Sequence, residues 1–164
     1  MRLASPTNRL LAVFLALVLS LAGAGCAIKL VSDYDSAAFE EILATGKKVD
    51  KFYGTLLETK PDARQYSAFS DQYVAIETDI QGIITRNQAR ALNAESTEIA
   101  RSILGLMSKY KDRHKERNDY SDGNAKLDRG RFVRLFAGAA SAEEAKKLTV
   151  DDKDAKADTK TPTK

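Results

Sequence analysis

The stretch FEEILATGKKVDKFYGTL, residues 39–56, decides the fold class of this chain. Apolar or small residues recur in it at alternating steps of three and four: Phe39, Ile42, Gly46, Val49, Tyr53 and Leu56. Because an α-helix has about 3.6 residues per turn, this spacing places all of them on one side, which we call a seam. The stretch therefore predicts a helix that needs other helices to cover its seam.

Three further seams follow along the chain. They consist of Tyr66, Phe69, Tyr73, Ile76, Ile80 and Ile83; of Ile99, Ile103, Leu106 and Tyr110; and of Ala125, Phe132, Leu135, Phe136 and Ala139. Seams at this spacing suit helices that pack at about 20° to each other. The sequence predicts an all-α fold, an antiparallel four-helix bundle. One residue from each seam is expected to mark its interior, namely Phe39, Tyr73, Ile103 and Phe136.

Helix-breaking and polar residues separate the seams. Pro61 ends the first helix, because proline disfavours helical geometry in the residue before it. Residues 118–124, rich in Asn, Asp and Gly, predict a turn before the fourth helix. The second seam turns polar at Asn87 and Arg90, so its buried part is expected to stop near Ile84.

A further helix start is predicted close to the end of the fourth seam. Ser141 and Glu144 have the spacing of a capping box, in which each side chain bonds a free backbone amide of the first turn. This pattern predicts a short fifth helix up to Leu148.

The first 26 residues have the organisation of a bacterial export signal. Arg2 and Arg9 lie in a region without acidic residues, residues 10–21 are an apolar run, and Ala22-Gly23-Ala24-Gly25 precede Cys26. Small residues directly before a cysteine resemble the lipobox of bacterial lipoproteins, with Gly23 a departure from the usual Leu. The resemblance implies cleavage before Cys26 and attachment of lipid to its thiol.

Two other interpretations of this segment remain open. Residues 10–28 carry no charge over 19 positions, which is long enough for an uncleaved membrane-spanning helix. A plain signal peptide would instead leave Cys26, the single cysteine of the chain, as a free thiol. The expected organisation is a signal peptide (1–25), a lipidated cysteine and short linker (26–35), a helical bundle domain (36–149) and a disordered tail (150–164).

The residues after the cysteine carry a second resemblance. Lys29-Leu30-Val31-Ser32-Asp33-Tyr34-Asp35, together with the helical layout, resembles a group of small proteobacterial lipoproteins to which no activity is assigned. The resemblance implies a lipid-anchored helical protein. Ala27 follows the cysteine, and by analogy with the sorting rule of enteric lipoproteins a residue other than Asp there favours the outer membrane. Ser32, Asp33 and Asp35 are also good helix-start residues.

Composition excludes several classes of function. The chain has 26 Lys and Arg residues against 23 Asp and Glu, and Arg2 and Arg9 belong to the leader, so the mature part is close to neutral. A nucleic-acid binder would carry a clear basic excess. His114 is the single histidine, which rules out a catalytic triad or a multi-histidine metal site. Met107 would face the same side of its helix, so the two cannot hold a haem between them. We expect no cofactor.

Residues 118–123 superficially resemble a calcium-binding loop. Aligned on Gly123, however, the third position is Tyr120 and the twelfth is Arg129, where the site needs a bidentate Glu. We therefore expect no metal.

The region 109–134 is locally basic. The residues concerned are Lys109, Lys111, Arg113, Lys115, Arg117, Arg129, Arg131 and Arg134. They are interpreted either as a contact for phosphate-bearing lipid head groups or another acidic envelope surface, or as a solvated helix face.

These observations favour a membrane-tethered, periplasm-facing helical lipoprotein of the outer membrane. It would act as a non-enzymatic interaction or structural module, with another envelope protein as its partner. The alternative is a carrier of lipid or another apolar ligand in the bundle core, for which seam and near-seam glycines (Gly46, Gly54, Gly82 and Gly105) would leave room. A cavity above about 300 Å³ would favour the carrier. A third alternative is an enzyme that uses carboxylates alone, such as Glu40, Glu41, Glu77 or Asp79.

Overall fold

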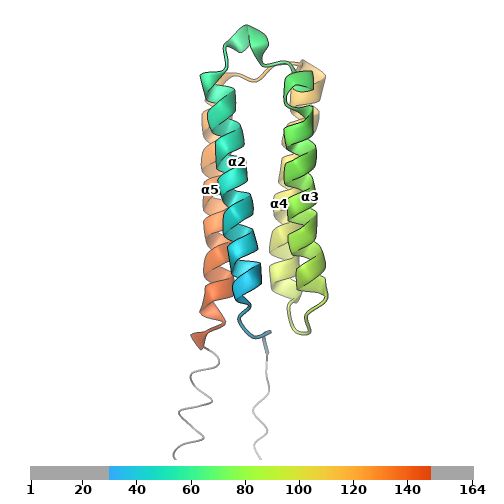
Figure 1. Ribbon diagram of the computed structural model, residues 1–164, viewed down its shortest axis with the longest axis vertical. Helices are drawn as coiled ribbons and strands as arrows, with labels where there is room; N and C mark the ends of the chain where they lie inside the picture. Colours follow the sequence, from blue (N-terminus) through green and yellow to red (C-terminus); the bar gives the residue numbers. More distant parts are fainter. Residues whose placement is uncertain (1–29, 149–164) are drawn as a thin grey trace, which may run out of the picture. The chain divides into compact units, whose positions relative to one another are not determined.

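The computed structural model describes residues 30–148, which form an antiparallel four-helix bundle (Figure 1). Its helices are α2 (Ser36–Glu58), α3 (Ser70–Gln88), α4 (Ala94–Arg117) and α5 (Asp122–Ala145), and residues 30–148 contain no strand. Helix α2 packs chiefly on α5 and α3 chiefly on α4, with further contacts between α2 and α3 and between α4 and α5. The predicted fold class is confirmed. The predicted signal peptide, Cys26 and the tail lie outside the described residues.

Most helix boundaries follow the predicted signals. The Asp35 side chain caps α2 by accepting hydrogen bonds from the amides of Ala37 (3.0 Å) and Ala38 (3.3 Å). Helix α2 ends at Glu58, just before Pro61, as predicted. Helix α4 ends at Arg117 with Asn118 in the left-handed conformation (φ 50°), which asparagine tolerates better than most residues.

The second helix begins later than its seam suggests. Tyr66 lies in a short 3₁₀ turn, Tyr66–Ala68, which follows another at Pro61–Ala63, and α3 starts only at Ser70. Phe69 is nevertheless buried. The connection from α2 to α3 therefore adds to the core from outside a regular helix.

The predicted fifth helix is not a separate element. Helix α5 continues through Ser141, which is exposed, to Ala145. A capping box forms only where the preceding chain is not helical, whereas residues 137–142 are rich in alanine, the strongest helix former.

Three of the four predicted marker residues are buried, since Tyr73, Ile103 and Phe136 have exposed fractions of 0%, 2% and 4%. The prediction for Phe39 is wrong, because its side chain is only half-buried at the edge of the core and Ala38 occupies the buried position beside it. Alanine lets α2 approach its neighbours closely near its first turn.

Polar residues extend the buried interior beyond the apolar seams, which corrects the expectation that burial stops near Ile84. Asn87 and His114 are 2% and 0% exposed. Within residues 30–148, no helix is both long enough and apolar enough to cross a membrane.

Candidate functional site

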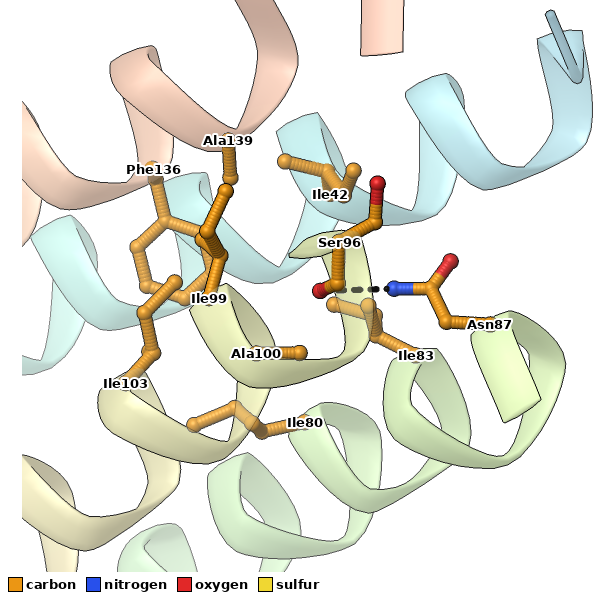
Figure 2. Close-up of a pocket in the computed structure, with 10 residues that line it drawn as sticks. All are labelled: Ile42, Ile80, Ile83, Asn87, Ser96, Ile99, Ala100, Ile103, Phe136 and Ala139. Carbon is orange, nitrogen blue, oxygen red and sulfur yellow. Dashed lines mark hydrogen bonds between the residues drawn. The ribbon is translucent and has the colours of Figure 1, made fainter. Parts of the chain in front are cut away.

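The interior of the bundle contains one small apolar hollow among all four helices (Figure 2). Isoleucines from α2, α3 and α4 and Phe136 from α5 surround it, and its complete lining is Ile42, Ile80, Ile83, Asn87, Ser96, Ile99, Ala100, Ile103, Phe136 and Ala139. The Asn87 amide donates a hydrogen bond to the backbone carbonyl of Ser96 (3.1 Å). The hollow measures about 10 Å³, which is room for about one water molecule. An apolar ligand cannot fit there in this conformation.

The glycines do not open a core cavity either. A Cβ atom on Gly46 would lie 3.0 Å from Phe136 Cβ, and one on Gly82 would lie 2.9 Å from a Glu41 carboxylate oxygen. Gly54 and Gly105 have nothing within 4 Å of such an atom. The first two glycines allow close packing and the other two face open space.

A larger hollow lies on the surface between α2 and α5, and we call it the α2–α5 groove. It measures about 360 Å³ and is lined by Leu43, Gly46, Lys47, Asp50, Lys51, Val133, Phe136 and Ala137. Gly46 and Phe136 both line it, and a Cβ atom on Gly46 would lie 3.0 Å from Phe136 Cβ, so α2 and α5 approach closely here. Leu43 and Val133 remain 38% and 51% exposed, so apolar surface faces solvent. The sequence signal for this groove is that both side chains are apolar but lie off their seams.

The charge in the α2–α5 groove is positive. Asp50 is neutralised by Arg129, which donates two hydrogen bonds to its carboxylate (2.6 and 2.8 Å). The hydrogen bond from Arg129 lowers the pKa of Asp50 below its ordinary value. Lys47 and Lys51 are exposed and have no ion pair within residues 30–148. The groove therefore combines apolar side chains with two free ammonium groups.

Ion pairs engage half of the predicted basic residues. Lys111 pairs with Glu77 of α3 (2.6 Å), Arg129 pairs with Asp50 of α2, and Arg113 and Arg131 both pair with Asp128 of α5. The remaining four are exposed and have no ion pair in the described part of the chain: Lys109, Lys115, Arg117 and Arg134. Half of the predicted set is thus engaged in ion pairs, and three of these four pairs join different helices, whereas Arg131–Asp128 lies within α5.

His114 is a core residue rather than part of a charged surface. Its Nε2 donates to the backbone carbonyl of Arg64 (2.8 Å), and the Tyr73 hydroxyl donates to Nδ1 (3.1 Å). A carbonyl only accepts, so Nε2 carries the proton, and in the neutral ring Nδ1 then accepts from the Tyr73 hydroxyl. Burial lowers the pKa of His114 below its ordinary value. Its neighbours in sequence, Arg113 and Lys115, are charged, but the His114 side chain itself is buried.

A second buried polar group lies nearby on α5. Asp128 accepts hydrogen bonds from the Tyr120 hydroxyl (2.7 Å), from Arg131 (3.2 Å) and from Arg113. Burial raises the pKa of Tyr120 and of Tyr53. The α2–α5 groove and the core hollow are lined by other residues, so these groups do not face either of them.

Three of the four acidic residues considered for catalysis are engaged in ion pairs. Glu41 accepts from Arg86 (2.8 Å), Glu77 from Lys111 (2.6 Å), and Asp79 pairs with Lys48. Glu40 is exposed on α2. Residues 30–148 contain no group of three or more His, Cys, Asp and Glu side chains suited to hold a metal ion.

Comparison of the chain with protein-family models, with curated proteins and with solved structures finds no match.

Proposed function

We propose that this protein is a lipid-anchored, non-enzymatic interaction module of the bacterial envelope. It is held in the outer membrane by lipid on Cys26, faces the periplasm and binds another envelope protein through the α2–α5 groove. The groove is the observation that carries the proposal, because it combines exposed apolar side chains with a hollow of about 360 Å³ and two cations without ion pairs in the described part of the chain. The core hollow of about 10 Å³ gives no support to the carrier of apolar ligands.

The chemistry of the groove indicates its occupant. Leu43, Val133 and Ala137 offer contacts for an apolar stripe, and Lys47 and Lys51 offer partners for carboxylates. An amphipathic helix whose apolar stripe is flanked by Asp or Glu meets both requirements, in the helix-in-groove mode of recognition. Charge complementarity of this kind contributes more to specificity and association rate than to affinity.

The anchor is tested at Cys26. A hydroxyl cannot form the thioether to a diacylglyceryl group, so Cys26→Ser should abolish incorporation of labelled fatty acid and leave unprocessed precursor. Wild-type incorporation into the Cys26→Ser protein would refute the anchor.

The groove is tested by photo-crosslinking in living cells. A photoreactive amino acid at Val133 (51% exposed) is compared with one at Val74 of α3 (59% exposed), which lies outside the groove. We expect an adduct at Val133 alone, with the crosslinked peptide of the partner carrying carboxylates beside apolar residues.

Charge reversal supplies the second arm of this experiment. Lys47→Glu with Lys51→Glu should remove the Val133 adduct, whereas Lys109→Glu with Lys115→Glu on α4 should leave it intact. Equal capture at Val133 and Val74, or an adduct that survives reversal at Lys47 and Lys51, would contradict the proposal.

A further inference from the structure

The end of the bundle at which the chain enters from Cys26 carries exposed apolar side chains. This end, which we call the linker end, contains Val31, the α3–α4 loop (residues 89–93) and the end of α5 (Figure 1). A hollow of about 270 Å³ opens there, lined mainly by apolar residues: Val31, Leu92, Asn93, Glu95, Ser96, Ile99, Ala142, Ala145 and Lys146. Leu92 and Leu148 are 49% and 70% exposed. The linker end therefore presents apolar surface in an open position.

Leu92 has a backbone conformation that makes its exposure notable. Its φ is 59°, in the left-handed region that non-glycine residues rarely adopt. Glycine or asparagine would relieve that strain and would also avoid exposing a large apolar side chain. Local folding preferences thus do not explain a leucine at this position.

A buried hydrogen-bond network holds the loop in this conformation. The Ser32 amide donates to the Leu92 carbonyl (2.9 Å), and the Ser32 hydroxyl donates to Asn93 Oδ1 (2.8 Å). Lys146 Nζ donates to the same oxygen (2.6 Å), and Asn93 Nδ2 donates to Asn87 Oδ1 (3.0 Å). Ser32, Asn87, Asn93 and Lys146 are all buried. The network fixes the loop while the Leu92 side chain stays outside, so the loop presents leucine in a defined position.

The opposite end of the bundle lacks this feature. Residues 59–69 and 118–121, which connect the helices there, expose no large hydrophobic side chain. The cations Arg101, Lys146 and Lys147 at the linker end are neutralised by Glu98, Glu143 and Glu144. Glu95, which lines the hollow, is exposed and has no ion pair among the described residues. The contact that this end offers is therefore apolar rather than electrostatic.

The short segment between Cys26 and Val31 limits how far the linker end can lie from the attached lipid. Val31 is five residues from Cys26, and a fully extended chain spans at most about 18 Å over that distance. A lipid on Cys26 would therefore keep this end, and not the opposite one, within reach of the bilayer surface.

We infer that the linker end docks on the membrane, with Leu92, Leu148 and Val31 inserted at the level of the lipid head groups. This inference rests on the proposed lipid anchor. Docking directs the helices away from the bilayer, so that the α2–α5 groove, which lies along the helices, faces the periplasm. The contact is expected to be the same on zwitterionic and anionic membranes, because the ion pairs at this end leave no cationic excess.

The test uses the full lipidated protein reconstituted into phosphatidylcholine vesicles. An environment-sensitive fluorophore is attached to Leu92→Cys or, as the matched control, to Leu127→Cys, because Leu92 and Leu127 are both 49% exposed and Leu127 lies near the start of α5. Cys26 is the single native cysteine, so lipidation leaves the introduced thiol as the only one to label. We expect a shift to shorter wavelength and loss of most of the fluorescence on addition of head-group-proximal doxyl lipids at position 92, and neither effect at position 127.

A label-free measurement covers the case in which a labelled variant fails to fold. With wild-type protein, a photoactivatable phospholipid should crosslink to the peptide that contains Leu92 and not to the one that contains Leu127. Phosphatidylglycerol should leave the quenching and the crosslinking unchanged.

The possible outcomes separate the inference from the anchor. Protein that carries the lipid mass and floats with vesicles, but shows equal solvent exposure at positions 92 and 127, overturns the docking and leaves the anchor intact. Wild-type protein that lacks the lipid mass and does not float overturns both. Position 92 covered only when a second protein is added also overturns the docking.

Discussion

Two glycines on α2 allow the close approach of α2 and α5 to be measured. Replacing glycine by alanine inside a helix stabilises it by about 1 kcal/mol, because alanine restricts the unfolded chain and favours helical geometry. A Cβ atom on Gly54 meets nothing within 4 Å. Gly54→Ala should therefore raise the free energy of unfolding by about 1 kcal/mol.

Gly46→Ala adds the same helical preference but also a collision. Its Cβ atom would lie 3.0 Å from Cβ and 3.1 Å from Cγ of Phe136. The position of Cβ is fixed by the backbone, so a rotamer change of Phe136 cannot relieve the 3.0 Å contact and α2 must move away from α5. Overpacking of this kind costs about 1 to 3 kcal/mol. The net effect should range from about zero to a loss of about 2 kcal/mol.

The assay is urea unfolding of the chain from Ala27 onward, followed by circular dichroism at 222 nm. The free energy of unfolding of Gly54→Ala should exceed that of Gly46→Ala by about 1 to 3 kcal/mol, the overpacking cost alone, since the helical preference cancels between them. Equal stabilisation by both substitutions would show that α2 and α5 are farther apart at Phe136, and the α2–α5 groove would lose its described shape.

Three further predictions follow from individual residues. Phe136→Ala should lower the free energy of unfolding, measured in urea, by about 3 to 5 kcal/mol. Val133→Ala, on the exposed side of the same helix, should change it by no more than about 0.5 kcal/mol. A similar small effect of both substitutions would contradict the assigned core. Asp35→Ala removes the cap of α2 and should cost about 1 kcal/mol and lower the melting temperature, while an unchanged melting temperature would show that the cap contributes nothing. Burial lowers the pKa of His114, so the unfolded chain binds a proton at this residue more readily than the folded chain does. The contribution of the neutral His114 ring to the free energy of unfolding is therefore fully present above pH 6.5 and is lost as the pH falls below that value. Urea unfolding at several pH values should show a steeper loss below pH 6.5 for wild type than for His114→Gln, and identical pH profiles would refute a buried neutral ring.

Part of the surface chemistry could be predicted from sequence and part could not. Asp35 was predicted as a helix-start residue, because capping depends on residue type and on position relative to the helix alone. The sequence could not show which basic residues of 109–134 are paired. Lys111 and Arg129, for example, pair with Glu77 and Asp50, which lie on other helices and at least 34 residues away. Whether a cation is free depends on those distant partners.

Periodicity by itself determined the all-α class, the four helices and most of their ends, because helix geometry and helix termination are local properties of the chain. Only the tertiary structure decided which polar side chains are buried. His114, Asp128 and Glu143 are buried because residues distant in sequence, such as Arg64, Arg113 and Arg90, satisfy them. The same holds for the α2–α5 groove, whose lining comes from two helices that are far apart in the sequence and meet closely at Gly46 and Phe136. Such contacts depend on how the helices meet, and no pattern within one helix encodes that.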